Sequence, residues 1–312
     1  MTTESLPHTP AELGLPDVPV EARPADPAVH HVRAKLDREI RALLAHEPGT
    51  RSGADPEDLH QMRVALRRMR SVLKLSGELV GDGAEPVRAE LGWLGQSLGE
   101  VRDHDVLIEH LREVIADFEV RDQPAGRQLV SRFVSERATA KGRLTRALSS
   151  ARYSTLLREV SLLTRAAPST VDVPQRDLIA GLAKPHRKLA KAVRALPADP
   201  PDDDLHALRI HGKKLRYAAE LAQTSAKKKQ AKRIKALLTA TKDFQTVLGD
   251  HQDAVLAAER MRTVLDTGDS AIGFVAGRIA ERELTRRAEA RATWRASWEA
   301  VDAAAQAVVS GN

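Results

Sequence analysis

The chain has 312 residues, of which 42% are apolar, 29% charged and only 3% aromatic, so its core has to be built from Leu, Val and Ala. Such a composition favours packed helices over sheets, and no stretch alternates with period two over the length of a strand. The formal charge of +6 favours an anionic partner, the absence of Cys excludes disulfides and thiolate metal sites, and no apolar run is long enough to span a bilayer.

The order of the segments predicts two helical halves. Residues 1–27 hold six of the sixteen prolines and lean acidic, which predicts a disordered tail. Helical periodicity then predicts a first half over residues 28–165, interrupted by a loop at 47–54. Residues 166–174 read as a linker, 175–308 as a second half and 309–312 as a short tail. We therefore expect an all-α fold of two bundle-like halves with about four helices each.

One stretch of the first half, LHQMRVALRRMRSVLK at residues 59–74, combines two faces on a single helix. At about 100° per residue, five basic side chains fall within less than a quarter-turn, and no acid interrupts them. Four apolar residues form the neighbouring stripe, which predicts a helix at the edge of a bundle with an anion-binding face. The basic residues are His60, Arg63, Arg67, Arg70 and Lys74, and the apolar ones are Met62, Leu66, Met69 and Leu73.

The same stretch occurs again as LHALRIHGKKLRYAAE at residues 205–220, at a constant offset of 146. Only one apolar position is lost, where Gly212 replaces Leu66. Each copy is followed by a turn that contains a glycine and acidic residues, at 98–103 and at 248–253. A weaker third echo pairs Glu136-Arg137 and Lys141 with Glu281-Arg282 and Arg286. Three echoes in one order predict a duplicated unit of roughly 140 residues.

These motifs together resemble the CHAD domain, the conserved histidine α-helical domain, over residues 28–308. The resemblance rests on His60-x-x-Arg63-x-x-x-Arg67-Arg68-x-Arg70, on Leu98-Gly-x-x-Arg-Asp103, and on the second copy ending in Lys213-Lys214-Leu-Arg216-Tyr217 with Glu220. It implies two four-helix bundles related by a pseudo-twofold axis, with a basic channel or groove between them that binds inorganic polyphosphate. We expect a stand-alone member without the CYTH domain that some relatives carry.

The expected polyphosphate contacts come from the two basic helix faces, because Arg grips phosphate oxygens with two donors and Lys acts as a mobile point charge. They are His60, Arg63, Arg67, Arg70, Lys74, His206, Arg209, Lys213 and Arg216. Further cations that could widen the track are Arg33, Arg38, Arg68, Arg102, Arg137, Lys141, Lys184, Arg187, Lys188, Lys191, Lys214, Arg282 and Arg286.

Several of these residues also have a purely structural interpretation. Arg68 and Lys214 point roughly 100° away from the basic face, so that an ion pair competes with a ligand contact. His60 and His206 begin their helices and can serve helix-start hydrogen bonding. Asp103 and Asp253 are expected to be structural, since a carboxylate would repel a polyanion. The six cations at 227–235 fit either a solvated face or an auxiliary anion surface.

The sequence predicts no enzyme, cofactor or metal site. Acid-x-x-His pairs at Glu57 and Asp203 mimic di-iron bundles, but four cations share the His face of each helix. A phosphate-binding loop of the form GxxxxGK[ST] is absent. A general polyanion or nucleic-acid binder is the main alternative, although the basic faces lack aromatics for stacking bases. The third alternative is a scaffold that docks an acidic protein. We expect the protein to be cytoplasmic, with association with polyphosphate granules possible, and to have no membrane partner.

Overall fold

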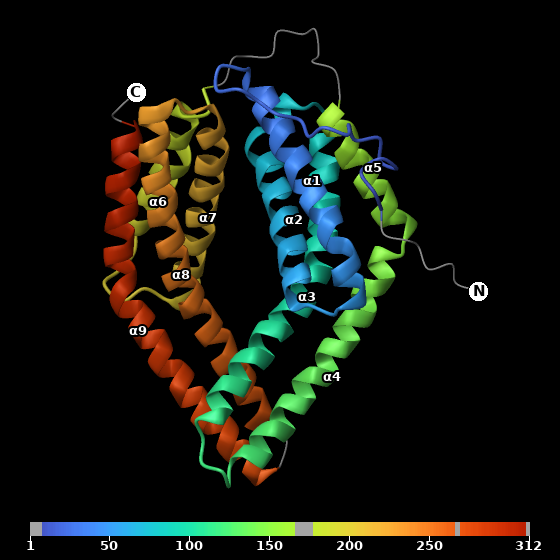
Figure 1. Ribbon diagram of the computed structural model, residues 1–312. Coiled ribbons are helices and arrows are strands. Elements are labelled where there is room, and N and C mark those ends of the chain that lie inside the picture. Colours follow the sequence, from blue (N-terminus) through green and yellow to red (C-terminus); the bar gives the residue numbers. More distant parts are fainter. Residues whose placement is uncertain (1–7, 166–176, 266–268, 310–312) are drawn as a thin grey trace, which may run out of the picture. The chain divides into compact units, whose positions relative to one another are not determined.

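The computed structural model describes residues 8–165, 177–265 and 269–309, and the expected linker and C-terminal tail lie almost wholly outside these ranges. Within them every regular element is helical, which confirms the all-α prediction (Figure 1). The elements are α1 Ala28–Ser52, α2 Pro56–Ser76, η1 Gly77–Leu79, α3 Ala84–Ala116, α4 Gln123–Leu148, α5 Ala151–Arg165, η2 Ala180–Leu182, α6 Ala183–Arg194, α7 Asp202–Ser225, α8 Lys228–Leu265 and α9 Ser270–Val309.

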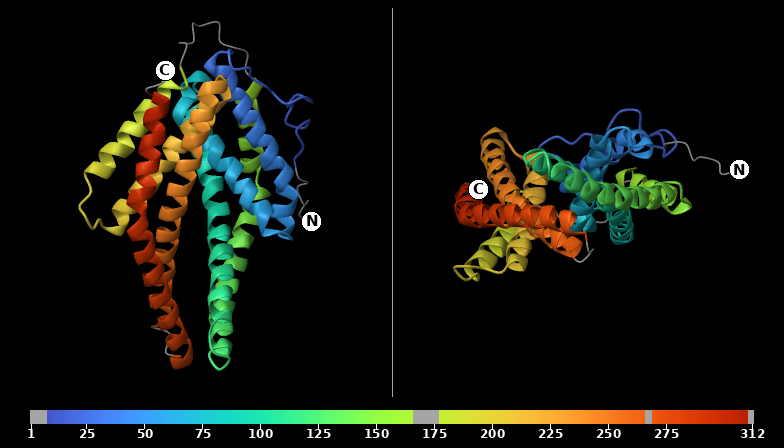
Figure 2. Two further views of the ribbon diagram at one scale, coloured as in Figure 1. Left: turned by 60° about the vertical axis from the view of Figure 1, so that its left-hand side comes forward. Right: turned by 90° about the horizontal axis from the view of Figure 1, so that it is seen from below.

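The helices divide into two compact units whose composition differs from the predicted halves in one segment. The first unit comprises the described residues of Met1–Asp105 and Glu136–Leu178, and the second those of Val106–Ser135 and Ile179–Asn312. The end of α3, the start of α4 and the connection between them therefore pack with the second unit (Figure 2 shows the same helices from two further sides). None of the described helices combines the length and apolarity that a bilayer crossing requires.

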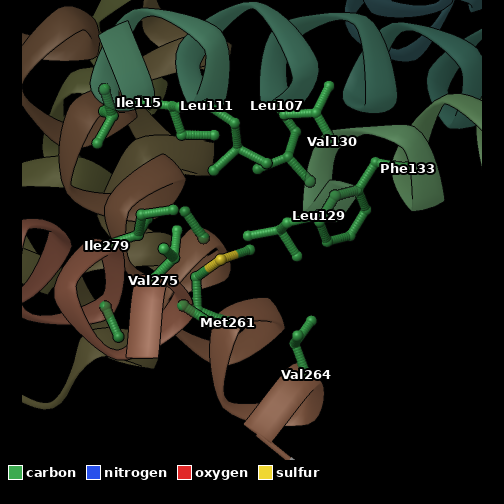
Figure 3. Packing of buried hydrophobic residues seen from close by; sticks show 14 of the residues in the cluster. Leu107, Leu111, Ile115, Leu129, Val130, Phe133, Met261, Val264, Val275 and Ile279 are labelled. Carbon is green, nitrogen blue, oxygen red and sulfur yellow. The ribbon is translucent and has the colours of Figure 1, made fainter. Parts of the chain in front are cut away.

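A hydrophobic cluster of the second unit explains this division. Leu107, Leu111 and Ile115 of α3 and Leu129 and Phe133 of α4 are buried together with residues of α8 and α9 (Figure 3). At about 25 cal/mol per Å² of apolar surface, burying these large side chains is the main stabilising contribution at this end of the unit. The residues from α8 and α9 are Ala257, Met261, Val264, Val275, Ala276, Ile279 and Ala280.

The prediction of a disordered tail is wrong for residues 8–27, and residues 1–7 lie outside the described part. Leu13 and Leu15 are each only 5% exposed, and the hydroxyl of Ser161 on α5 donates to the carbonyl of Leu13 at 2.7 Å. The backbone N–H of Val20 donates to the buried carboxylate of Asp37 on α1 at 3.0 Å. The prolines of this segment disfavour helix, but they do not make it disordered. The buried side chains of Leu13 and Leu15 and the two hydrogen bonds attach it to the first unit.

The prediction of a loop at 47–54 is also wrong, because α1 continues to Ser52 and contains Pro48. Glu47 is fully buried and accepts from Arg51 one turn later, at 2.8 Å, which ties the last turn of the helix to the core. The helix ends at Gly53, whose φ of 69° is left-handed and suits glycine.

Helix α2 begins at a capped turn. Asp55 caps it by accepting from the N–H of Glu57 at 2.8 Å, and Pro56 occupies the first helical position, where a missing N–H is harmless. Its predicted apolar stripe is buried, with Met62 and Met69 fully inaccessible. Burial of this stripe against α1 fixes the rotation of α2 and with it the direction of the basic face.

Candidate anion-binding faces

The basic face of α2 adjoins α3, which also contains the predicted turn at 98–103. That segment lies inside α3, so it is an uninterrupted helical turn, and the same holds for 248–253 in α8. His60, Arg63 and Arg67 are half-buried, whereas Arg70 and Lys74 are exposed. The first unit therefore offers a basic face whose first three side chains are partly fixed by packing and whose last two reach into solvent.

Arginines of α2 lie across a row of glycines on α3. A Cβ placed on Gly99 would lie 3.7 Å from the Nε and an Nη of Arg63, and one on Gly92 would lie 3.3 Å from an Nη of Arg70. A Cβ on Gly95 would lie 3.8 Å from the other Nη of Arg70. Residues 92, 95 and 99 share one helical face. The row of small residues lets both guanidinium groups lie close to the backbone of α3.

The second unit repeats the central part of this arrangement. A Cβ on Gly249 of α8 would lie 3.6 Å and 3.8 Å from an Nη and the Nε of Arg209 on α7, matching the contact between Arg63 and Gly99. Arg216 differs from its counterpart Arg70, because the position of Gly95 is taken by Gln245. Its Nη donates to the Oε1 of Gln245 at 3.3 Å and its Nε to Glu220 at 3.2 Å.

Two arginine nitrogens of these faces are buried without an acceptor. The Nε of Arg67 in the first unit and the Nε of Arg209 in the second have no hydrogen-bond partner among the described residues. A buried donor left without a partner costs about 1–3 kcal/mol, and such groups in a folded protein call for a ligand, ion or water. Each face therefore contains one arginine whose buried Nε has no acceptor among the described residues.

Carboxylates compensate the first face only weakly. Asp103 lies 3.5 Å from an Nη of Arg63, and its side chain is 62% exposed, so this ion pair is long and solvent-screened. The contact agrees with a structural role for Asp103. Arg68 points elsewhere and pairs at 3.7 Å with Glu39 of α1, whose side chain is 2% exposed. The structural interpretation of Arg68 is therefore supported.

His60 lies among cations. Burial lowers its pKa below the ordinary value, and the charges of Arg102, Arg67 and Arg63 lower it further, against an opposing effect of Glu57. Its counterpart His206 has a different neighbour, because Gln252 replaces Arg102, and the ring Nδ1 lies 2.7 Å from the amide Oε1 of Gln252. The two histidines thus occupy equivalent positions with unequal surroundings.

His251, which replaces Val101 in the second copy, is buried inside the second unit. Its side chain is 1% exposed, and its Nε2 lies 3.0 Å from the carboxylate of Asp202 at the start of α7. Arg287 and Arg291 of α9 hold the same carboxylate at 2.8 Å each. Burial lowers the pKa of His251 in spite of this carboxylate. The network fixes the first turn of α7 to α8 and α9.

Most of the additional cations either serve the fold or lie on the surface. Lys141 donates to the carbonyl of Ser52 at 2.8 Å and so caps α1. Arg137 pairs with Asp105, and Arg282 with Asp117 at 2.9 Å. Arg286 pairs with the buried Glu283 at 2.7 Å, and Arg33 is 8% exposed. The exposed residues are Arg38 of α1 and Lys184, Arg187, Lys188 and Lys191 of α6.

One histidine of α7, which points roughly opposite to the basic face, is absent from the predicted site residues. Burial lowers the pKa of His211, and the charges of Lys214 and Lys188 lower it further. This places a lysine of α6 and a lysine of α7 beside the same ring, so that α6 contributes to the positive potential at α7. Gly99 was noted only as part of the motif at 98–103, and the row that it forms with Gly92 and Gly95 was missed, although the spacing of three and four residues is visible in the sequence.

Comparison with known proteins gives a consistent result. The family model of the CHAD domain matches residues 34–262. Two curated proteins of Mycobacterium tuberculosis, "Uncharacterized protein MT2285" of strain CDC 1551 and "Uncharacterized protein Rv2226" of strain H37Rv, are each 31% identical over 256 residues. That stretch covers 76% of this chain and 45% of theirs, so the chain spans less than half the length of these relatives.

Solved structures share the fold. PptA from Streptomyces chartreusis is similar with a TM-score of 0.71 at 21% identity, over 88% of this chain and all of that one. The CHAD domain from the plant Ricinus communis is similar with a TM-score of 0.66 at 24% identity, over 95% of this chain and 96% of that one. At these identities the likeness concerns the fold alone.

Proposed function

The chain belongs to the CHAD domain family, a family linked to polyphosphate, and from this premise we propose that it binds inorganic polyphosphate without catalysing a reaction. The faces that bind are those of α2 in the first unit and α7 in the second. The observation that carries the proposal is the arrangement that both units share, in which a motif arginine lies over a glycine of the next helix, Arg63 over Gly99 and Arg209 over Gly249. Phosphate oxygens form strong, charge-assisted hydrogen bonds with guanidinium groups of this kind.

The chemistry of the faces favours polyphosphate over nucleic acid. Polyphosphate presents oxygens and negative charge along its whole length, and no bases. The faces present guanidinium and ammonium groups at helical spacing, and Tyr217 is the only aromatic residue within either motif. Single-stranded nucleic acid gains about 1–3 kcal/mol of binding free energy for each base stacked on an aromatic side chain. The two basic faces lack the aromatic side chains that would provide this stacking.

Calorimetric titration of the full chain with long-chain polyphosphate at two salt concentrations tests this proposal. We expect tight binding that weakens with added salt, because the contacts are charge pairs. Duplex DNA and tripolyphosphate, titrated in parallel, are expected to bind more weakly. Equal affinity for DNA would replace the proposal with general polyanion binding, and absence of binding to polyphosphate would overturn it.

The protonation of His60 gives a second expected result. In the free protein burial and Arg102 hold its pKa below the ordinary value, so the ring is neutral near pH 7. A bound polyanion favours the imidazolium and raises the pKa, so binding takes up a proton and tightens as the pH falls toward the lowered pKa of the free protein. Binding enthalpies in buffers of different ionisation enthalpy measure this uptake. The uptake is expected to fall in His60→Gln, and an unchanged value in that variant would exclude His60 as its source.

A further inference from the structure

A row of lysines on α8 begins beside the basic face of α7. Gly249, Lys242, Lys235 and Lys228 follow one another at intervals of seven residues. Seven residues of a straight α-helix return to the same side with a drift of about 20°, so the four positions stay within about 60° of one direction. The three lysines are all exposed. Lys228 and Lys242 are separated by about 21 Å along the helix.

Contacts between α7 and α8 join this row to the motif arginines. Arg209 lies over Gly249, the first member of the row, and Arg216 donates to Gln245, one turn further toward Lys242. Moving along α7 from Arg209 to Arg216 therefore moves along α8 in the direction of Lys242, Lys235 and Lys228. The lysines continue the line of cations beyond the point where the motif of α7 ends.

The charged residues around the lysine row are almost all positive. The sequence contains no Asp or Glu between Glu220 and Asp243, and Glu220 accepts from Arg216. The first turn of α8 holds no acid although acids are favoured at that end of a helix, and lysines there oppose the helix dipole by about 0.3–1 kcal/mol each. A face kept only for solubility normally mixes both signs. This arrangement costs stability locally and so favours a role in binding anions.

The first unit has no such extension. At the constant offset of 150 that relates Gly249 to Gly99, the positions of Lys242, Lys235 and Lys228 are taken by Gly92, Glu85 and Glu78. Glu85 pairs with Arg88, and Arg70 lies over Gly92. The row positions of the first unit therefore carry two acids where those of the second unit carry two lysines, and the anion face of the first unit ends near Arg70 and Lys74.

We propose that Lys228, Lys235 and Lys242 form an extension of the polyphosphate site in the second unit, which engages chains long enough to pass beyond Arg216. This inference rests on the proposed function and assigns residues of α8 to the expected preference for long chains. Tripolyphosphate is much shorter than the row and can occupy the motif face without reaching it. Long-chain polyphosphate gains additional charge pairs along α8.

The test compares two double variants of α8 that remove the same charge. Lys235→Gln with Lys242→Gln changes the row, and Lys229→Gln with Lys232→Gln changes exposed lysines of the same helix that point at least about 60° away from those two. We expect the row variant to lose on the order of tenfold in affinity for long-chain polyphosphate and about 1.5 in the slope of log affinity against log salt. The control variant is expected to lose less than about twofold, and tripolyphosphate affinity to stay unchanged in both.

The outcomes separate this inference from the proposed function. Equal losses in the two variants, or no loss in the row variant, would overturn the extension while leaving wild-type binding of polyphosphate in place. A row variant that loses affinity for duplex DNA but not for polyphosphate would also overturn it. Failure of the wild-type chain to bind long-chain polyphosphate would overturn both. Circular dichroism of each variant establishes that the helices are retained.

Discussion

Replacing Arg63 and Arg67 together by alanine is expected to lower the affinity for long-chain polyphosphate by about 100-fold and to leave the helix content unchanged. Hydrogen bonds to charged groups contribute about 1.5–3 kcal/mol each, and about 1.4 kcal/mol corresponds to a factor of ten. Removing Arg67 also removes a buried donor that lacks an acceptor in the free protein, so the folded state loses little. Calorimetric titration and circular dichroism measure the two quantities.

A matched variant of the same unit controls for the loss of positive charge. Arg146 of α4 and Arg158 of α5 are exposed arginines outside the basic face of α2. Alanine at both positions removes the same two charges, and we expect less than about a threefold loss of affinity from long-range attraction alone. Similar losses in the two double variants would mean that overall charge, and not the face of α2, determines binding. The corresponding change in the second unit is Arg209→Ala with Lys213→Ala.

The local features of the two faces could be predicted from the sequence. The 3.6-residue period placed Met62 and Met69 in the core and Arg63 and Arg67 beside them. Such features depend on residues within one or two helical turns, which the sequence displays directly. The bonding of Arg68 to Glu39 also follows from its direction on the helix, although its partner could not be named.

Features that depend on distant residues could not be predicted. The tail was expected to be disordered because of its prolines, whereas burial of Leu13 and Leu15 depends on α1 and α5. The assignment of 106–135 to the second unit depends on apolar residues of α8 and α9 that lie more than 100 positions away. The exposure of a side chain at such a position is decided by its tertiary partner, and helical period does not identify that partner.

The contact between α7 and α8 shows how two copies of one motif keep their packing with different residues. In the first unit Leu66 of α2 faces Gly95 of α3, where a Cβ would lie 2.9 Å from a methyl carbon of Leu66. In the second unit Gly212 replaces Leu66, Gln245 replaces Gly95, and the large residue comes from the neighbouring position of α8. Gly212 of α7 faces the ring of Phe244 on α8, and a Cβ on Gly212 would lie 3.0 Å from that ring. Leu94 is the counterpart of Phe244 at the offset of 150.

Substituting leucine at Gly212 is therefore expected to destabilise the second unit by about 2 kcal/mol. Overpacking a core costs about 1–3 kcal/mol or more, and the ring of Phe244 is fully buried, so it has no solvent-exposed space into which it could move. Replacing a helical glycine by another residue stabilises the helix by about 1 kcal/mol through higher helix propensity, which offsets only part of this cost. Gly212→Ala is the control, because one methyl group at 3.0 Å is nearly balanced by the gain in helix propensity. Urea unfolding of the full chain measures both variants.

Phe244→Leu provides the decisive comparison, because it recreates the residue of the first unit at that position. Alone it leaves a cavity beside Gly212 and is expected to cost about 1–2 kcal/mol. Combined with Gly212→Leu, it makes room for the new side chain, so the double variant is expected to be more stable than the sum of the single losses by about 1–2 kcal/mol. Strictly additive losses would show that the side chains introduced at positions 212 and 244 do not compete for one space. A favourable coupling would show that the two copies keep one helix contact by exchanging a large residue between partners, so that the glycine in the second motif conserves the packing that positions Arg209 and Lys213.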